Sequence, residues 1–328
     1  MHFLGIDGGG SRTRALLCDE TGKVLGWGLS GPCNPCTQSK EACFEQLRSA
    51  IRCALATHAL ESITAAHIGV AGAGDPFARK ILESVADQLF DRNATQVSIS
   101  HDLKIAHAGG FAGRVGSALV AGTGSACYGV NRQGKEILTG GWGDLIDDAG
   151  SGSWIGLRAL QLCVRQADGR AAGNKLQRAV LRFLKLDSVD EIKARIHIIG
   201  LPRDERAKLA PLVIELAQSG DAIADQIAAE AVRELTLLVQ SNFRALNVDQ
   251  NQLILLGGLN ESAYFRKRLE ACISAAIPHV LVVQPRLSAT AGAVLLAMRA
   301  AAIPAEGAVL ERMHRSLTRL PADDPQEC

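Results

Sequence analysis

A glycine-rich turn between two β-patterned segments occurs twice in this sequence. The first, GGGS, follows the short apolar segment HFLGID (residues 2–7) and precedes TRALLCD (13–19). The second, GTGS (122–125), lies inside the apolar stretch SALVAGTGSACYGV (117–130). In both places a strand enters the glycines directly and another leaves them, so each turn joins antiparallel neighbours. Two halves that begin with the same hairpin predict a chain built from two similar domains.

The segments after each hairpin extend this repeat. Helix 40–57 is predicted from apolar residues at spacings of three and four. The first half supplies further strands at 23–30, 66–71 and 96–100, and helices at 77–90 and from about 103. The second half supplies three strands within 117–142, helices at 153–168, 221–245 and 289–301, a mostly helical stretch at 174–216, and strands at 252–258 and 279–283.

We therefore predict a mixed α/β fold of two βββαβαβα-like domains. The first covers residues 1–112, and the second covers 113–302 and contains a helical insertion. The boundary is expected in the glycine-rich stretch 109–116. A tail at 303–328, with three prolines and many charges, is expected to be partly disordered. Two similar domains facing one another would form a cleft, the usual place for a ligand.

The composition excludes several classes of partner. The 328 residues carry a net charge of +1 and form no block of like charge, which argues against a nucleic-acid groove or an anionic membrane surface. No apolar stretch approaches the roughly 20 residues of a membrane span. MHFLGIDGGG lacks the apolar run of a signal peptide, so we expect a cytoplasmic protein. The nine cysteines, an odd number without framework spacing, are then mostly buried thiols.

The glycine turns match neither of the common nucleotide-binding fingerprints. The dinucleotide motif needs a helix directly after its glycines, and GxxxxGK[ST] occurs nowhere in the chain. A glycine turn between strands can nevertheless bind phosphate, because its successive backbone N–H groups form an anion-binding nest. The predicted phosphate-binding residues are Gly8, Gly9, Gly10, Ser11, Arg12 and Thr13 in the first turn, and Gly122, Thr123, Gly124 and Ser125 in the second. Each turn alone is also explained as a hairpin that needs positive φ.

Asp7 ends the first strand beside the first glycine turn. A carboxylate in this position can hold Mg²⁺, directly or through water, on a bound triphosphate. The alternative is that Asp7 stabilises the turn by bonding its own backbone.

Four motifs in order now support a resemblance. GIDGGGSRT, AGTGS, GGWG with DDAGSG close behind, and LGG near the C-terminus resemble the N-acetylglucosamine kinase and glucosamine kinase group of the BadF/BadG/BcrA/BcrD ATPases. This group belongs to the sugar-kinase branch of the actin-like ATPase superfamily, and the match extends to about residue 300. It implies two ribonuclease H-like domains around a central cleft, ATP and Mg²⁺ as cofactors, an amino sugar as substrate and a homodimer.

Asp102, in SISHDLKIAHAG, lies where a predicted strand ends and a helix begins. Ligands of α/β sheets bind at this edge, and aspartate is also a common helix N-cap. The resemblance implies that Asp102 is the general base that accepts the proton of the sugar hydroxyl.

The loop GGWGDLIDDAGSG (140–152) carries three carboxylates. The resemblance implies that Asp148 hydrogen-bonds sugar hydroxyls, with loop capping as the alternative, and that Gly141, Trp142 and Gly143 line the sugar site. Trp142 suits stacking on a sugar face, or packing. Like-charge repulsion leads us to expect Asp144 and Asp147 in solvent. Asp147 replaces the usual glycine of the family, and Ala149 replaces its usual Glu or Gln. These two differences leave open which sugar is the substrate.

Two more glycine turns are candidate binding elements. Gly72, in GVAGAGDP, follows a strand and is expected to line the sugar site through its backbone. Gly257 and Gly258, in LLGGLNES, match the adenosine-side glycines of the family. Both segments are also explained as tight strand-to-helix turns.

GPCNPC (31–36) is the one CxxC of the chain. A structural zinc needs about four ligands, and Cys43 and Cys53 lie about 15 Å apart along the predicted helix, so both cannot join Cys33 and Cys36. A redox CxxC normally opens a helix, which Pro35 disfavours. The resemblance implies instead that Asn34 hydrogen-bonds the sugar. A cluster shared across a dimer remains the alternative.

Three functions follow from these observations. The leading one is an ATP-dependent amino-sugar kinase that phosphorylates N-acetylglucosamine or glucosamine, at the 6-hydroxyl. The second is an ATPase activator of the 2-hydroxyacyl-CoA dehydratase or benzoyl-CoA reductase type, which requires cluster cysteines. The third is a non-catalytic, nucleotide-dependent sensor, which would need no base at Asp102.

Overall fold

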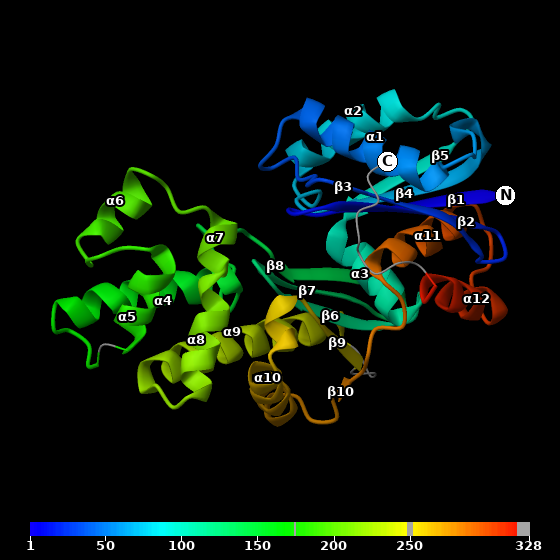
Figure 1. Ribbon diagram of the computed structural model, residues 1–328. Coiled ribbons are helices and arrows are strands. Elements are labelled where there is room, and N and C mark those ends of the chain that lie inside the picture. The colour runs from blue at the N-terminus through cyan, green and yellow to red at the C-terminus, as the bar shows by residue number, and fades with distance from the viewer. Residues whose placement is uncertain (174, 248–251, 320–328) are drawn as a thin grey trace. The chain divides into compact units, whose positions relative to one another are not determined.

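The computed structural model describes residues 1–173, 175–247 and 252–319 (Figure 1). The chain divides into two compact units, one made of residues 1–114 with 284–328, the other of residues 115–283. Each unit contains one five-stranded sheet, ordered β3-β2-β1-β4-β5 in the first and β10-β9-β6-β7-β8 in the second. In both sheets the first three strands of the unit are antiparallel and the later strands run parallel to the first, so the predicted repeat of the sheet pattern is confirmed.

The sheet of the first unit is covered on both faces, because its strands alternate apolar side chains. Leu4 and Ile6 of β1 pack with α1 and α2, whereas Phe3 and Gly5 face α11. Figure 1 shows α1 and α2 on one side of these strands and α3 with α11 on the other. The elements are β1 (His2–Gly8), β2 (Thr13–Asp19), β3 (Val24–Ser30), α1 (Lys40–Leu55), β4 (Ile63–Val70), α2 (Pro76–Leu89), β5 (Gln96–His101), α3 (Asp102–Phe111), α11 (Ala289–Ala300) and α12 (Ala308–Leu317).

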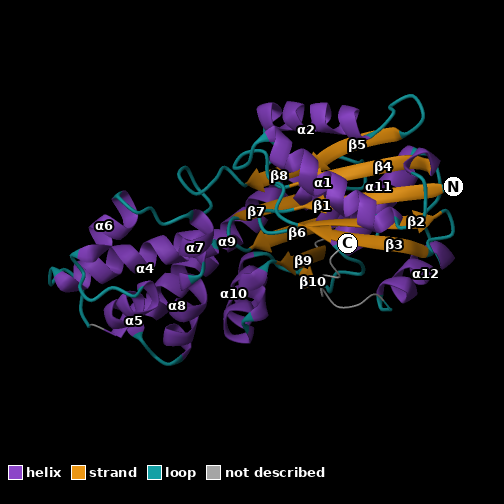
Figure 2. Cartoon of the chain, turned by 45° about the horizontal axis from the view of Figure 1, so that its top comes forward, coloured by secondary structure: helices purple, strands orange, loops and turns teal. Residues whose placement is uncertain are grey.

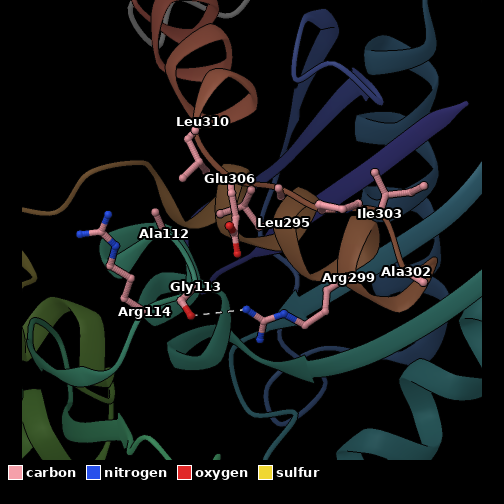
Figure 3. Close-up of a pocket in the computed structure, with 12 residues that line it drawn as sticks. Ala112, Gly113, Arg114, Leu295, Arg299, Ala302, Ile303, Glu306 and Leu310 are labelled. Carbon is pink, nitrogen blue, oxygen red and sulfur yellow. Dashed lines mark hydrogen bonds between the residues drawn. The ribbon is translucent and has the colours of Figure 1, made fainter.

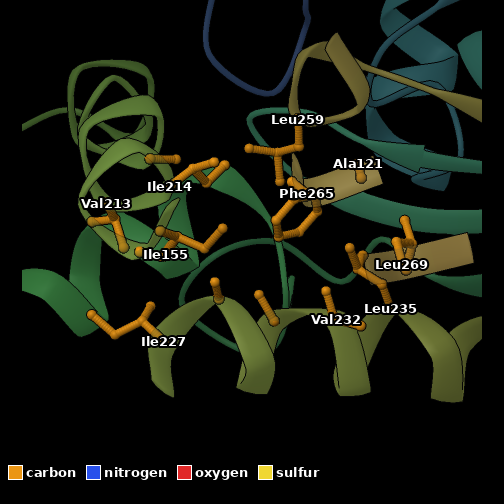
Figure 4. Close-up of a cluster of buried hydrophobic side chains, with 14 of the residues drawn as sticks. Ala121, Ile155, Val213, Ile214, Ile227, Val232, Leu235, Leu259, Phe265 and Leu269 are labelled. Carbon is orange, nitrogen blue, oxygen red and sulfur yellow. The ribbon is translucent and has the colours of Figure 1, made fainter. Parts of the chain in front are cut away.

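The second unit has its sheet and a large helical part around one core (Figure 2). Figure 4 shows Val232 and Leu235 of the long helix α9 turned toward Phe265 and Leu269 of α10. In the described part of the stretch predicted as mostly helical, from residue 175 onward, the structure has four separate helices, α5 to α8. The elements are β6 (Gly116–Ala121), β7 (Ser125–Val130), β8 (Glu136–Gly140), α4 (Gly152–Ala167), α5 (Lys175–Leu184), α6 (Glu191–His197), α7 (Arg203–Ala207), α8 (Leu209–Gln218), α9 (Ala222–Leu246), β9 (Gln252–Leu256), η2 (Gly258–Glu261), α10 (Ala263–Ala276) and β10 (Leu281–Val282).

The second unit ends earlier than expected: it ends at residue 283, whereas the second domain was predicted to extend to residue 302. Helix α11 packs on the first sheet, where a Cβ on Gly5 would lie 2.5 Å from the backbone nitrogen of Val294. The glycine therefore lets the helix backbone touch the strand, and residues from 284 onward belong with the first unit. Within the tail expected at 303–328, α12 is an ordered helix with Met313 buried, while residues 320–328 lie outside the described part.

Among residues 1–173, 175–247 and 252–319, no helix combines the length and the apolar character needed to cross a membrane.

Candidate active site

The base of the first glycine turn is hydrogen-bonded to neighbouring segments of the chain, whereas its tip is open. The Gly8 carbonyl accepts from the N–H of Ala71 (2.8 Å), and the Gly9 carbonyl accepts from the N–H of Cys33 (2.9 Å). A Cβ on Gly10 would meet nothing within 4 Å, and the adjoining Ser11 and Arg12 are exposed. The Thr13 hydroxyl, predicted to face phosphate, is instead buried and donates to the Gly31 carbonyl (2.8 Å). Thr13 thus braces the turn.

Asp7 and Asp102 lie near one another in the first unit. The pKa of Asp7 is raised to about 6, mainly by burial; Arg14 lowers it, the charge of Asp102 adds to the increase, and Arg12 lowers it. An Arg14 guanidinium nitrogen is 3.9 Å from an Asp7 carboxylate oxygen. Burial also raises the pKa of Asp102, against the backbone N–H of Leu103, which donates to its carboxylate at 3.0 Å. Two half-buried carboxylates, one at the end of β1 and one directly after β5, form an acidic pair that suits a cation or a transferred proton.

The N-cap of α3 is His101, one residue before Asp102. Its Nδ1 accepts a hydrogen bond from the N–H of Lys104 at 3.2 Å. Capping therefore does not account for Asp102, which is the first helical residue. The half-buried carboxylate has a raised pKa and lies near Asp7, which marks Asp102 as a functional candidate.

Asn34 and Gly72, two predicted sugar-binding residues, are neighbours. Gly72 has φ +85°, and a Cβ there would lie 2.7 Å from the Asn34 side-chain oxygen. That oxygen accepts from the N–H of Cys36 (3.0 Å). No described residue accepts a hydrogen bond from the Asn34 amide nitrogen, so its donors are available to a ligand.

The two cysteines that flank Asn34 differ in surroundings. Cys33 is buried against Cys43, whereas Cys36 is exposed, and all three are free thiols. In the described part of the chain, no three His, Cys, Asp or Glu side chains are grouped so that they would hold a metal ion.

The second glycine turn is bound to the start of α4. The N–H groups of Gly152 and Ser153 donate to the carbonyls of Gly122 (2.8 Å) and Thr123 (3.2 Å). Gly257 has φ +92°, and a Cβ there would lie 2.5 Å from the Ala121 carbonyl oxygen, so only glycine fits. The structure thus brings the predicted phosphate turn and the predicted adenosine-side glycines together; Gly258 opens η2 with free space at its Cβ position.

Ser125 and the loop after β8 are connected. The buried Ser125 hydroxyl donates to the Ala149 carbonyl (2.9 Å), so it supports the loop and is not directed to phosphate. Gly141 and Gly143 have φ of +75° and +92°. The Trp142 side chain is 71% exposed, which excludes a packing role in the second unit.

Asp148 is almost fully buried and has φ +50°. Its carboxylate accepts a hydrogen bond from Arg203 of α7. Burial raises the pKa of Asp148; Arg203 and the backbone N–H groups of Ser125 and Gly143 counteract this increase.

Arg203 and its neighbour Arg206 were not predicted as site residues. Arg206 donates to Asp144, so the expectation that Asp144 points into solvent was wrong. That expectation was based on repulsion between the carboxylates of the loop, and the positive charge of the Arg206 guanidinium compensates this repulsion. Asp147 is half-buried and accepts from the N–H of Ala149 (3.3 Å). One sequence feature could have indicated that these two arginines act together: their spacing of three, which places both on one face of a helix.

A pocket of about 500 Å³ in the first unit lies apart from these residues (Figure 3). It is formed by the ends of α3 and α11 and the segment before α12. Figure 3 shows Arg299 beside Gly113 and Glu306 directed inward. None of the predicted site residues lines it.

Two five-stranded sheets of the same topology, each with a glycine turn between its first antiparallel strands, define the two-domain class of actin-like ATPases. The model of the BadF/BadG/BcrA/BcrD ATPase family matches residues 4–297, and the chain belongs to this family. The resemblance inferred from the motifs is thereby confirmed.

Several known proteins are similar to this chain over most of their length. An N-acetylmuramic acid/N-acetylglucosamine kinase of Clostridium acetobutylicum is 32% identical, over 90% of this chain and 98% of that protein. An N-acetyl-D-glucosamine kinase of Dictyostelium discoideum is 26% identical over 90% and 97%. A structure from Chromobacterium violaceum, described as that of a candidate N-acetylglucosamine kinase, has a TM-score of 0.73 at 25% identity and covers 90% of this chain and 98% of its own.

The raised pKa of Asp7 predicts a pH-dependent stability. The folded state binds a proton more tightly than the unfolded one, so wild-type stability falls as pH rises from about 4 to about 6, by roughly 3 kcal/mol in total. We expect Asp7→Asn to raise the melting temperature by several degrees at pH 8 without Mg²⁺ or nucleotide, and to leave it unchanged near pH 3.5. Asp87→Asn, at an exposed surface position, is the control. Equal melting temperatures of Asp7→Asn and wild type at pH 8 would contradict this.

Proposed function

We propose that this chain is an ATP-dependent amino-sugar kinase that transfers the γ-phosphate of ATP to the 6-hydroxyl of N-acetylglucosamine or glucosamine. The observation that carries the proposal is Asp102: a half-buried carboxylate with a raised pKa, directly after β5 and near Asp7, in a helix whose N-cap is His101. The kinase names of the relatives support the same chemistry.

Asp102 would act as the general base. Because burial raises its pKa, its ionised form is a stronger proton acceptor than an exposed aspartate. It would take the proton of the sugar hydroxyl as the oxygen bonds to phosphorus, while the leaving ADP carries away the bonding electron pair.

The nucleotide would bind through the two glycine turns and the adenosine-side glycines. Gly10 and Ser11 lie at the open tip of the first turn, and Thr123 and Gly124 belong to the second. Carboxylate oxygens are the donors that Mg²⁺ prefers, so Asp7 fits a nucleotide-borne ion, which would neutralise phosphate charge when bound.

The sugar would be held by Asn34, Gly72 and Asp148, with Trp142 on a sugar face and Gly141 and Gly143 shaping the loop. The exposed indole ring and the free Asn34 donors support these roles. N-Acetylmuramic acid, which the name of the clostridial relative includes, is a further acceptor to test. We also propose a cytoplasmic homodimer.

Asn34→Ala is expected to raise the KM for the sugar about tenfold or more and to leave the KM for ATP within twofold. The substrate hydrogen bonds that it removes go to the sugar and not to ATP, and the other lost bond, from the N–H of Cys36, lies within the same loop. Steady-state kinetics with each substrate varied in turn measures the effect. Thr37→Ala, in the same loop, is the matched control. Equal increases in both KM values would exclude the sugar-binding role.

ADP release across a panel of glucosamine, N-acetylglucosamine, N-acetylmuramic acid, N-acetylmannosamine and glucose tests the proposal. We expect turnover that depends on an amino sugar. ATP hydrolysis indifferent to every sugar, with visible absorption after anaerobic purification, would favour the activator ATPase. Binding of ATP without any turnover would favour the sensor.

A further inference from the structure

Arg203 reaches the second glycine turn from a helix outside the sheet. Its Nη2 donates to the Oδ2 of Asp148, and a Cβ on Gly124 would lie 2.0 Å from that Nη2 and 2.8 Å from that Oδ2. Gly124 does not have a positive φ. A side chain at this position would therefore have to displace the guanidinium end of Arg203 from Asp148.

The helix that carries Arg203 has a fixed position. A Cβ on Gly156 would lie 2.1 Å from the Arg206 carbonyl oxygen, so the backbone of α7 rests directly on α4. The same helix α4 binds the turn through the N–H of Gly152. Arg206 adds a second attachment, to Asp144. The short helix and the turn are therefore both held by α4, which sets the direction from which Arg203 approaches.

We propose that Arg203 is the positioning residue for Asp148: it holds this carboxylate against Gly124 in the orientation in which Asp148 receives the acceptor sugar. The inference rests on the proposed function, since it takes Asp148 as a sugar ligand. Asp148 has only 2% of its side chain exposed, and a buried carboxylate needs a partner both to stay ionised and to keep one orientation.

Two charged groups face Asp148: Arg203, which lowers its pKa, and Asp144, which raises it. Without Arg203, burial and Asp144 would act unopposed, apart from the backbone N–H groups of Ser125 and Gly143. The protonated form of Asp148 would then persist to higher pH. The KM for the sugar should rise, and the acid limb of its pH profile should move to higher pH.

Arg203→Ala and Arg203→Lys test this by steady-state kinetics from pH 5 to 9. We expect Arg203→Ala to raise the KM for the sugar 10- to 100-fold, the range seen when partners of metal ligands are removed, with a smaller change for ATP. Arg203→Lys should restore part of the loss. Arg158→Ala, which removes another half-buried guanidinium paired with a carboxylate (Glu230) in the same unit, should leave the profile unchanged. An unchanged KM and profile in Arg203→Ala would overturn the proposal.

A double-mutant cycle separates positioning from a structural role. If Arg203 acts through Asp148, the double variant Arg203→Ala/Asp148→Asn should match Asp148→Asn alone. Fully additive losses would overturn the proposal. NMR titration of the Asp148 carboxyl carbon, wild type against Arg203→Lys and Gly124→Ala, needs no activity. We expect a higher pKa in both variants, and unchanged titration would contradict the role even if no sugar is phosphorylated.

Discussion

Asp102→Asn is expected to lower sugar-dependent ADP release by about 10²- to 10⁴-fold, with both KM values within a few-fold of wild type. The asparagine keeps the size and the acceptor oxygen for the N–H of Leu103 but cannot accept the hydroxyl proton. Loss of a general base costs this range of rate. Steady-state ADP release with saturating ATP and N-acetylglucosamine measures it.

Asp75→Asn is the matched control. Asp75 begins the other helix of the first unit that follows a parallel strand, and its side chain caps Phe77 and Ala78. Asparagine caps a helix as well as aspartate does, so this variant should retain wild-type turnover. If Asp102→Asn also retains it, Asp102 is not the base.

Gly292→Val is expected to destabilise the first unit by about 3 kcal/mol or more. A Cβ on Gly292 would lie 2.0 Å from the Ile105 carbonyl oxygen and 2.3 Å from the Gly109 nitrogen. The backbones of α3 and α11 touch at this glycine pair, so a larger side chain must push the helices apart. Because α3 begins with Asp102, turnover should fall with stability.

Urea unfolding followed by circular dichroism measures the shift of the midpoint. Gly74→Val serves as the control, since its Cβ would meet nothing within 4 Å. A midpoint for Gly292→Val equal to that of the control would show that the two helices do not pack as described.

Much of the fold could be predicted from local patterns. The hairpin strands at 13–19 and the helices from 40 and 77 follow from apolar spacing and turn residues, which act over a few neighbours. The family follows from four motifs in order. The place of α11 could not be predicted, because its apolar faces do not say which of two similar sheets they cover.

The site was predictable in part for the same reason. Asp7, Asp102 and the glycine turns carry local signals, and Gly257, predicted as an adenosine-side glycine, lies beside the second turn. The hydroxyls of Thr13 and Ser125 also have the residue type expected for phosphate contacts, yet long-range carbonyl partners engage them. Arg203 pairs with an aspartate 55 positions away, a contact that no periodicity reveals.

The position of the transferred phosphate tests the central claim most directly. The chain is incubated with ATP, Mg²⁺ and N-acetylglucosamine or glucosamine, and the product is analysed by phosphorus–proton correlation NMR, alongside Asp102→Asn. We predict a phosphate ester coupled to the two protons of carbon 6 in the wild-type reaction and none in the variant. Inorganic phosphate as the sole product, or an ester formed equally by Asp102→Asn, would contradict the account.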